Sequence, residues 1–279
     1  MNRQHILITG GAGFVASAMA EKLAEDENNF IVIVDNLLTG DISRIPQKEN
    51  VRFIKADVNR LEDISGVFYA FSFKYVFHYA AVVGVKRTID NPVMVLDDIT
   101  GIKNILSLSK NTGVQRVFFS SSSEVYGEPV EMPQNEHTTP LNSRLPYAIV
   151  KNVGEAFLKS YKKEYDLDYT IFWDGSQTRT FCYVEDNIQA CYNSFINNEV
   201  MNDVINIGND NEMTVLELAQ TIIRLSGSSS KIVHLPPLEE GDMSRRNPDI
   251  SKMRKLLGRE LTDIETGLSN VINNPSFIL

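Results

Sequence analysis

The sequence predicts an α/β protein in which helices cover both faces of a parallel β-sheet. In the first 172 residues, short runs rich in β-branched and aromatic residues alternate with longer amphipathic stretches. This alternation is typical of strand–helix–strand units, whose crossover helices lie on both faces of a doubly wound parallel sheet. The length of 279 residues suits one large domain, or one domain with a smaller lobe.

Six strands are expected in this first part, because each run is short, apolar and bounded by turn residues or by a helix. They are residues 5–9, 30–35, 51–57, 74–80, 116–122 and 168–172. The amphipathic stretches between them predict helices at 14–26, 60–71, 92–111 and 147–165. The proline-rich stretch 127–146 is expected to be a surface loop.

In the second part of the chain, strands and helices no longer alternate regularly. Its expected elements are a helix at 184–198, a strand at 203–208, a helix that opens at Thr214, a strand at 231–236, a turn-rich segment at 237–249 and two short C-terminal helices. We therefore predict a first domain at 1–172 and a smaller α/β lobe at 173–279. Helix 184–198 and strand 203–208 are expected to pack back on the first domain.

Composition narrows the class of protein. The net charge of −9 and the pI of about 5.0 argue against a binder of nucleic acid or of membrane surfaces. No apolar run approaches the ~18 residues of a membrane-spanning helix, and MNRQ leads straight into HILIT, which leaves no room for a signal peptide. Cys182 and Cys191 form no CxxC pair, so we expect thiols in a cytoplasmic protein, with no disulfide and no metal site.

A glycine turn follows the first strand, in 9-TGGAGFVAS-17. Glycines between a strand and a helix let backbone N–H groups approach a pyrophosphate at the helix N-terminus. Asp35 ends the second strand, 22 residues beyond Gly13. A carboxylate there can accept both hydroxyls of the adenosine ribose and would repel a 2′-phosphate. The turn and Asp35 together predict a dinucleotide site that takes NAD rather than NADP.

Tyr147 and Lys151 stand four residues apart in 144-RLPYAIVKNVGE-155, and no other tyrosine of the ten has a lysine at that spacing. Residues at this spacing share one face of a helix. A nearby ammonium favours the phenolate and lowers a tyrosine pKa that starts near ~10. The pair is either a proton acceptor with its partner or an exposed helical pair.

Together these features resemble the extended short-chain dehydrogenases/reductases, in the branch of NAD-dependent nucleotide-sugar epimerases, dehydratases and decarboxylases. The segments that carry the resemblance are 9-TGGAGFVAS-17, 35-DNLLTG-40, 56-ADV-58, 77-FHYAAVVGVKRTIDNP-92, 119-FSSSSEVYGEP-129, 147-YAIVK-151 and 174-DGSQTRTFCYVED-186. The resemblance implies a Rossmann-type fold, bound NAD, a UDP-sugar substrate and a homodimer formed through helices 92–111 and 147–165.

The resemblance also implies roles for single residues. Tyr147 would take the proton of a sugar hydroxyl as hydride leaves, Lys151 would bind the nicotinamide ribose, and Ser122 would hydrogen-bond the same hydroxyl. Ser121 or Ser123 could take the part of Ser122. Acceptor and nicotinamide must converge on one carbon for this chemistry. The implied cofactor-binding residues are Gly10, Gly13, Phe14, Val15, Asp35, Asn36, Asp57, Val58, Ala80, Ala81, Tyr147 and Lys151.

The implied substrate contacts are Ser123 and arginines that pair with the diphosphate. Arg179, and more weakly Arg245 or Arg246, match this role, because a guanidinium pairs phosphate oxygens bidentately. They could instead be surface arginines of an acidic protein.

Two segments point to different reactions. In 122-SSEVYG-127, Glu124 matches the Thr-Ser-Glu-Val-Tyr-Gly run of UDP-glucuronate decarboxylases, and Ser123 replaces the first acid of the dehydratases. The segment 80-AAVVGVKRTIDNP-92 is similar to 4-epimerases, which need no further acid or base. We expect a UDP-sugar 4-epimerase, with a decarboxylase as the alternative in which Glu124 is catalytic. A non-catalytic NAD-binding regulatory or scaffold protein would not need the Ser–Tyr–Lys set.

The chain departs from the family pattern at two places. Asp98 stands where relatives carry an asparagine, three residues before the glycine that matches Gly101. After strand 168–172, relatives have an Arg-x-x-Asn-x-(Tyr/Phe)-Gly-Pro run and a wall of the sugar pocket, whereas here 171-IFW-173 runs directly into 174-DGSQTR-179. Either that segment is omitted from this sequence or it is deleted in the protein.

Overall fold

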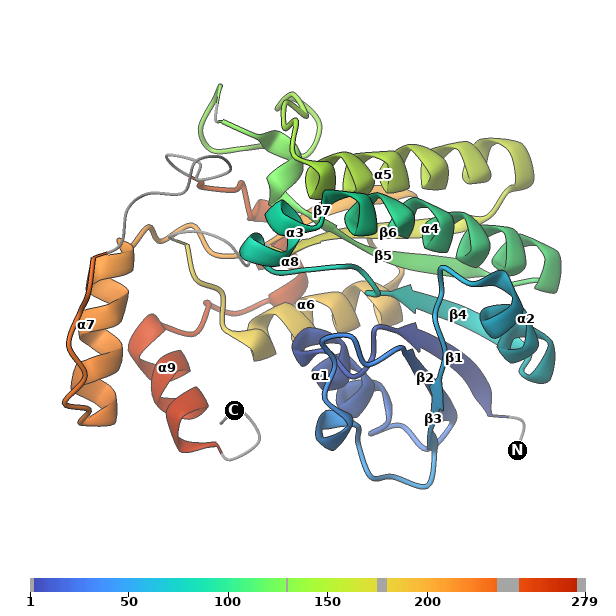
Figure 1. Cartoon of the computed structure of the whole chain (residues 1–279), viewed down its shortest axis with the longest axis horizontal. Coiled ribbons are helices and arrows are strands. Elements are labelled where there is room, and N and C mark those ends of the chain that lie inside the picture. Colours follow the sequence, from blue (N-terminus) through green and yellow to red (C-terminus); the bar gives the residue numbers. More distant parts are fainter. Residues whose placement is uncertain (1–2, 129, 175–179, 235–245, 275–279) are drawn as a thin grey trace.

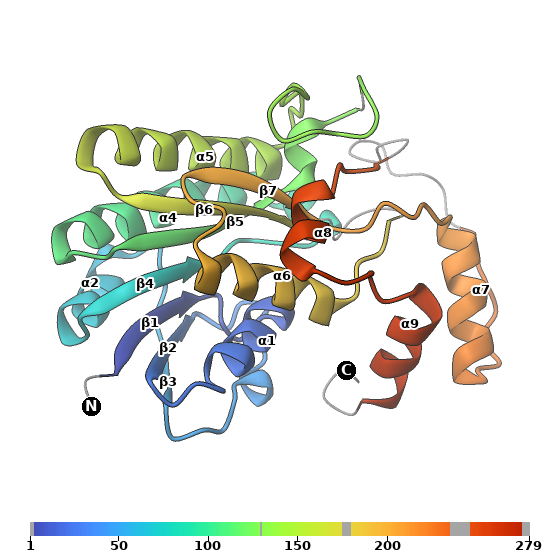
Figure 2. The same ribbon diagram turned by 180° about the vertical axis from the view of Figure 1, so that it is seen from behind.

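The computed structural model describes residues 3–128, 130–174, 180–234 and 246–274. A seven-stranded parallel sheet runs through the molecule with helices on both faces, which confirms the predicted fold class (Figures 1 and 2). The strand order is β3-β2-β1-β4-β5-β6-β7. The strands are β1 Gln4–Thr9, β2 Asn29–Asp35, β3 Val51–Lys55, β4 Phe73–His78, β5 Arg116–Ser122, β6 Asp168–Asp174 and β7 Asp203–Ile207.

Helices connect these strands and follow the last one. They are α1 Phe14–Leu23, α2 Leu61–Ala70, α3 Val85–Asp90, α4 Pro92–Thr112, α5 Pro146–Tyr165, α6 Val184–Asn197, α7 Val215–Ser226, α8 Ser251–Leu257 and α9 Ile264–Asn273, with 3-10 turns η1 Ile42–Arg44 and η2 Ser123–Tyr126. The sequence pattern did not predict α3. Thr214 caps α7, since its side chain accepts from the Glu217 N–H and Glu217 bonds back to the Thr214 N–H.

Successive strand residues point to opposite faces and fill two separate cores. Ile6 and Ile8 of β1 pack in the core that α1, α6 and α8 cover, whereas Leu7 between them packs with α2, α4 and α5. All three are fully buried. Such strands, buried on both sides, explain why the strand sequences are continuous apolar runs.

The direction of the winding reverses between β1 and β4, so the loops after these two strands leave toward opposite faces. The two loops nevertheless approach closely at their start. Gly10 has a φ of 68°, and a Cβ there would lie 2.7 Å from the backbone nitrogen of Ala80. Only glycine fits both the left-handed conformation and this contact. The crevice at the carboxyl ends of the strands is therefore built around Gly10.

The chain beyond residue 172 returns to the sheet. β7 pairs with β6, and α6 packs on α1. Helices α7 and α9 lie side by side at the end of the molecule away from β3 (Figures 1 and 2). The division into domains 1–172 and 173–279 stays a prediction.

The strand predicted at 231–236 is wrong over its described part, because residues 231–234 form no strand. Val233 is 75% exposed and Ile232 is 39% exposed. β-branched residues favour a strand only where a neighbouring strand and a core can receive them. No sheet edge of the described chain reaches this segment. Residues 235 and 236 lie outside the described residues.

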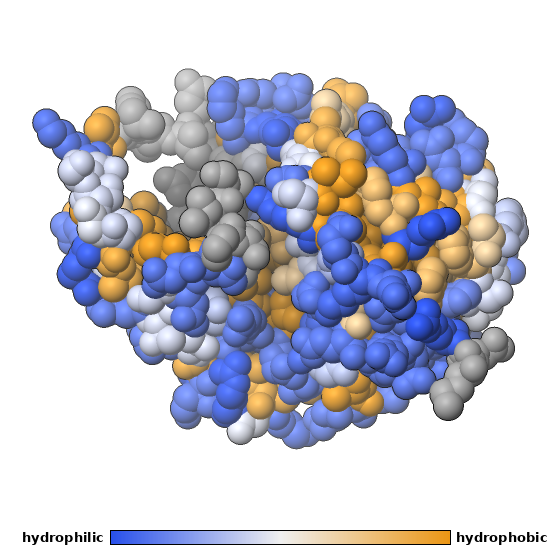
Figure 3. All heavy atoms as spheres, turned by 90° about the horizontal axis from the view of Figure 1, so that it is seen from below, coloured by the Kyte–Doolittle hydropathy of each residue, from blue (hydrophilic) through white to orange (hydrophobic). Residues whose placement is uncertain are grey.

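The face of the molecule that lies below in Figure 1 is largely hydrophilic, with hydrophobic residues in separate patches (Figure 3). Of the helices in the described ranges, none has the length and apolarity that crossing a membrane requires.

We expect Phe118→Ala to lower the free energy of unfolding by about 3–5 kcal/mol, because it opens a cavity in the core. The Phe118 ring stacks on Phe77 with centroids 4.2 Å apart and meets Phe195 edge-on. Urea denaturation measures the loss. Tyr69→Ala, at a residue that is 72% exposed, is the control and should change stability by less than about 0.5 kcal/mol. Equal effects of the two changes would contradict this packing.

Candidate active site

Two cavities of about 540 and 510 Å³ open at the carboxyl ends of the strands. They share five wall residues, which come from the turn after β1 and from the loop after β4. These are Gly10, Gly13, Tyr79, Ala81 and Val83. The cavities therefore adjoin across the glycine turn, and together they offer room for an extended ligand with a different group at each end.

The first cavity holds the residues predicted to bind adenosine. Its walls include Asp35, Asn36, Asp57, Val58, Ala80 and Ala81. Asp35 is buried, and its carboxylate accepts hydrogen bonds from the N–H groups of Ala12 at 3.0 Å and Leu37 at 2.7 Å. Asn36 donates to Asp57 at 3.1 Å. These bonds hold the acidic wall in place, and carboxylates there disfavour an additional phosphate on the ribose.

Asp98, the departure from the family pattern, is buried beside this cavity. Its carboxylate accepts from the backbone N–H of Val82 at 2.7 Å and from the side chain of Asn59 at 3.2 Å. Burial raises its pKa, and these two hydrogen bonds and Lys151 oppose the rise. An asparagine oxygen could also accept from Val82. The carboxylate thus anchors the β4 loop and adds a negative charge near Lys151.

The second cavity holds the residues predicted to do chemistry. Phe14 and Val15 of α1 lie on one side of it, and Tyr147 and Lys151 of α5 on the other. Lys151 is 3% exposed and donates to the carbonyl oxygen of Ser120 at 2.6 Å. Its Nζ lies 5.6 Å from the centre of the Tyr147 ring. The lysine is therefore fixed beneath the tyrosine, where its charge favours the phenolate.

The three candidate serines have different surroundings. Ser121 donates to Glu155 at 2.6 Å in the interior, and Ser123 accepts from Arg246 at 3.2 Å. Of the three, Ser122 alone lines the second cavity, together with Tyr147. Its oxygen also accepts from the Glu124 N–H at 3.2 Å and caps η2.

Glu124 lies in the same wall and forms a buried ion pair. Nη2 of Arg246 lies 2.9 Å from Oε1 of Glu124, and both side chains are buried. Arg246, predicted to bind substrate, reaches this cavity through Glu124 and Ser123. Arg179 and Arg245 lie outside the described residues.

The sequence reasoning missed His78, which ends β4 below Lys151. Its Nδ1 lies 2.7 Å from the Thr9 hydroxyl, and the ring stacks on Phe119. Burial, with a smaller contribution from Lys151, lowers the pKa of His78 to about 3. The ring is therefore neutral at physiological pH. The segment 77-FHYAA contained it, but a histidine within an apolar strand gave no signal of this contact.

These residues fit NAD. Gly10 has no side chain, so a pyrophosphate can approach the backbone of this turn. Helix α1 begins four residues later, and its N-terminal N–H groups can bind the phosphates. Asp35 lies at the ribose end, and Tyr147 and Lys151 lie at the other.

Comparison with known proteins agrees with this site. A model of the NAD dependent epimerase/dehydratase family matches residues 6–173, and the chain belongs to that family. NAD is its cofactor, and the protein is an enzyme of the isomerase or lyase type.

The similar proteins include both UDP-sugar 4-epimerases and UDP-glucuronic acid decarboxylases. UDP-glucuronic acid decarboxylase 1 of Danio rerio is 33% identical over 97% of this chain and 72% of its own, and UDP-glucose 4-epimerase of Mycolicibacterium smegmatis is 28% identical over 90% and 92%. The structure of UDP-glucose 4-epimerase from Thermotoga maritima with UDP-glucose has a TM-score of 0.87, 28% identity and coverage of 96% and 97%. The two sequence alignments extend over 314 and 292 positions, so both relatives contain residues that this 279-residue sequence lacks.

We expect His78 to destabilise the folded protein in acid. Its folded pKa of about 3 lies below the ordinary value of 6.5, so the unfolded chain binds the proton first. Its contribution is therefore fully present above pH 6.5 and is lost as the pH falls toward 3, by about 3 kcal/mol at pH 4. Urea denaturation of wild type and His78→Gln from pH 7.5 to 4 measures the difference. Parallel curves for the two proteins would contradict a neutral, buried His78.

Proposed function

We propose that the protein is a UDP-sugar 4-epimerase that acts through a 4-keto intermediate. One observation carries the proposal: Tyr147, Lys151 and Ser122 meet in a cavity that adjoins the dinucleotide cavity across the glycine turn. The similarity to 4-epimerases supports it.

The side chains can perform the proton transfers of this reaction. The Tyr147 phenolate takes the proton of the sugar 4-hydroxyl, while Ser122 holds that hydroxyl by a hydrogen bond. Lys151, held by the Ser120 carbonyl, keeps the phenolate anionic and offers donors to the nicotinamide ribose. Bound NAD, held along the two cavities, would supply the acceptor and donor of the C4 hydride. Once the keto sugar has turned, the hydride would return to the opposite face of C4, and Tyr147 gives the proton back to the C4 oxygen.

The state of Glu124 favours epimerisation over dehydration. Its carboxylate is engaged in the ion pair with Arg246, and Ser123 stands where the dehydratases carry their other acid. Epimerisation needs no such acid.

Decarboxylation of UDP-glucuronate is the second candidate. A carboxylate in the cavity wall can orient a 4-keto uronate, whose CO₂ leaves readily from a β-keto acid. The position of Glu124 in the wall and the similarity to UDP-glucuronic acid decarboxylases favour this reaction. A scaffold role is the weakest of the three, because it gives no reason for Ser122, Tyr147 and Lys151 to share a cavity.

The first experiment is to incubate the protein with NAD and UDP-glucose or UDP-glucuronate and to identify the product by mass and proton NMR. An isobaric product inverted at C4 would support the epimerase. A product lighter by CO₂ would establish the decarboxylase instead. Absence of both products, with UDP-N-acetylhexosamines also unchanged, would refute the proposal.

Tyr147→Phe is expected to lower kcat by about 10²–10⁴-fold, because the phenyl ring has no oxygen to take the proton. NAD binding, measured by calorimetry, should stay within about twofold of wild type, since the dinucleotide cavity is intact. Tyr165→Phe, at the other end of α5 and outside both cavity walls, is a matched control that should retain turnover. A Tyr147→Phe enzyme with most of its activity would show that another group is the base.

We also propose a cytoplasmic homodimer. Cys182 and Cys191 remain thiols, which fits a reducing compartment. Helices α4 and α5 pack side by side and leave apolar side chains outside, including Leu96 and Ile149, each 40% exposed. A second copy of the same two helices would cover them.

Ile149→Glu is expected to convert the dimer to a monomer, because a charge would be buried at the centre of that contact. Sedimentation velocity at micromolar concentration measures the change. Ile196→Glu on α6, at a residue that is 50% exposed, is the matched control and should leave the dimer intact. A dimer that survives Ile149→Glu would place the interface elsewhere.

A further inference from the structure

A buried asparagine on β7 links three segments around the sugar end of the candidate active site. Asn206 is 1% exposed. Its Oδ1 accepts from the Tyr126 hydroxyl at 3.2 Å, and its Nδ2 donates to the carbonyl oxygens of Gln134 at 3.0 Å and Asp249 at 3.1 Å. Both amide protons and the carbonyl oxygen are thus engaged at once.

The segments that Asn206 links carry both members of the buried ion pair. Tyr126 ends η2, the turn that contains Glu124. Asp249 follows Arg246 by three residues. The separation between Glu124 and Arg246 therefore depends on two hydrogen bonds to one side chain, each a few residues from the ion pair.

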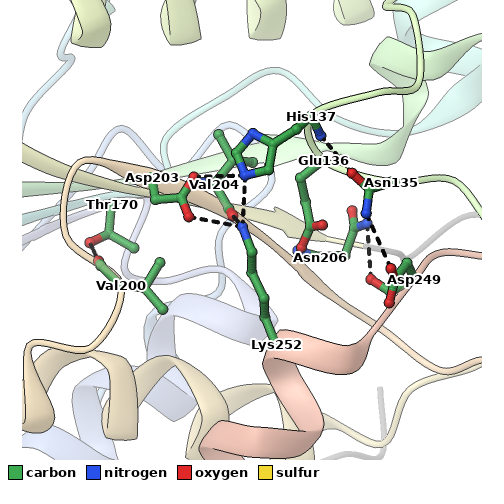
Figure 4. Close-up of polar contacts among 10 residues, drawn as sticks. All are labelled: Asn135, Glu136, His137, Thr170, Val200, Asp203, Val204, Asn206, Asp249 and Lys252. Carbon is green, nitrogen blue, oxygen red and sulfur yellow. Dashed lines mark hydrogen bonds and ion pairs between the residues drawn. The ribbon is translucent and has the colours of Figure 1, made fainter.

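The third segment reinforces this arrangement. Gln134 lies in the loop between η2 and α5, and its N–H donates to the Asn247 carbonyl at 2.8 Å, while its carbonyl accepts from the Asp249 N–H at 2.8 Å. Asn135 also donates to the Asp249 carboxylate at 3.2 Å, and the backbone N–H of Asn206 donates to Glu136 at 2.9 Å (Figure 4). The segment that carries Arg246 therefore pairs through its backbone with the loop around Gln134, in a parallel β-bridge between Gln134 and Pro248.

We infer that Asn206 is a positioning residue that sets the shape of the sugar-binding end of the site by holding Glu124 and Arg246 together. The inference rests on the proposed function, because it assigns the cavity beside Glu124 to the sugar. Asn206 touches no reacting atom and acts through the two segments that it joins.

A second set of contacts joins the same segments farther from the ion pair. Lys252 of α8 donates to the Asp203 carboxylate and to the Val204 carbonyl, both at 2.8 Å, and lies 3.0 Å from Nε2 of His137 (Figure 4). The Lys252 and Asp203 side chains are partly exposed, and none of the four residues lies in a wall of the two cavities. Lys252 therefore contributes to the docking of α8 without contacting η2, which makes it a suitable control.

Asn206→Asp is the sharpest variant, since the side chain keeps its size. It replaces two N–H donors by a carboxylate oxygen that faces two carbonyl oxygens, so the segment with Arg246 loses its anchor. Tyr126→Phe removes only the hydroxyl donor and is the milder variant if Asn206→Asp does not fold. Lys252→Met is the control.

We expect Asn206→Asp to raise KM for the UDP-sugar by about tenfold or more, because small misplacement of binding groups is costly, and to leave NAD affinity within about twofold. Tyr126→Phe should shift KM in the same direction by a smaller factor. Lys252→Met should lower Tm and leave KM within about twofold of wild type. Asn206→Asp and Tyr126→Phe proteins that fold and keep the wild-type KM would overturn the inference.

Hydrogen exchange tests the same inference without any substrate. In Asn206→Asp, or in Tyr126→Phe if needed, the amides of Gln134, Asp249 and η2 should exchange faster, while those of β1 and β2 keep their protection. In Lys252→Met, the amides of η2 should stay protected. Unchanged exchange at η2 in the Asn206 and Tyr126 variants would refute the positioning role. Absence of turnover in the wild type would refute the proposed function alone.

Discussion

The contact between the backbones of Gly10 and Ala80 is the constraint on which the rest of the site depends. These residues begin the loops after β1 and β4, the two strands between which the winding reverses. A side chain at position 10 would clash with the backbone of Ala80 and push the two loops apart. Ala80 follows β4 directly, so it could not shift without displacing the end of that strand. The five wall residues that the two cavities share all come from these loops. The region where the two cavities adjoin therefore depends on this close approach.

The opposite wall of the second cavity is organised by polar groups in the interior. Serines 121, 122 and 123 stand next to one another, yet one bonds to Glu155, one lines the cavity and one accepts from Arg246. This division follows from the change from β5 to η2, which turns the last serine away from the sheet. Glu124 of this wall is held by Arg246 from a distant part of the chain, and Asn206 links the two segments that carry them.

Much of the fold could be read from the sequence, because apolar runs, glycine turns and helix periodicity are local signals. The six early strands, Asp35 at the end of β2 and the helix of Tyr147 are such cases. The prediction of a strand was wrong over residues 231–234, because strand formation depends on a partner strand, which local sequence does not encode. The pairing of Glu124 with Arg246 and the environment of His78 were equally out of reach. Each joins residues that are far apart in sequence, so no spacing rule connects them.

Lys151 shows how the two ends of the site are coupled through charge. Its ammonium is almost fully buried, where an isolated charge would be costly. The Ser120 carbonyl accepts one of its protons, and the carboxylate of Asp98 lowers the cost of the positive charge from the side of the dinucleotide cavity. His78 stays neutral, because burial, and to a smaller extent the positive charge of Lys151, lowers its pKa to about 3. The ammonium of Lys151 is therefore the positive charge that can act on Tyr147 and on the nicotinamide ribose. An asparagine at position 98 would retain the hydrogen bond to Val82 but not the charge, so the aspartate at this position gives Lys151 an additional electrostatic partner.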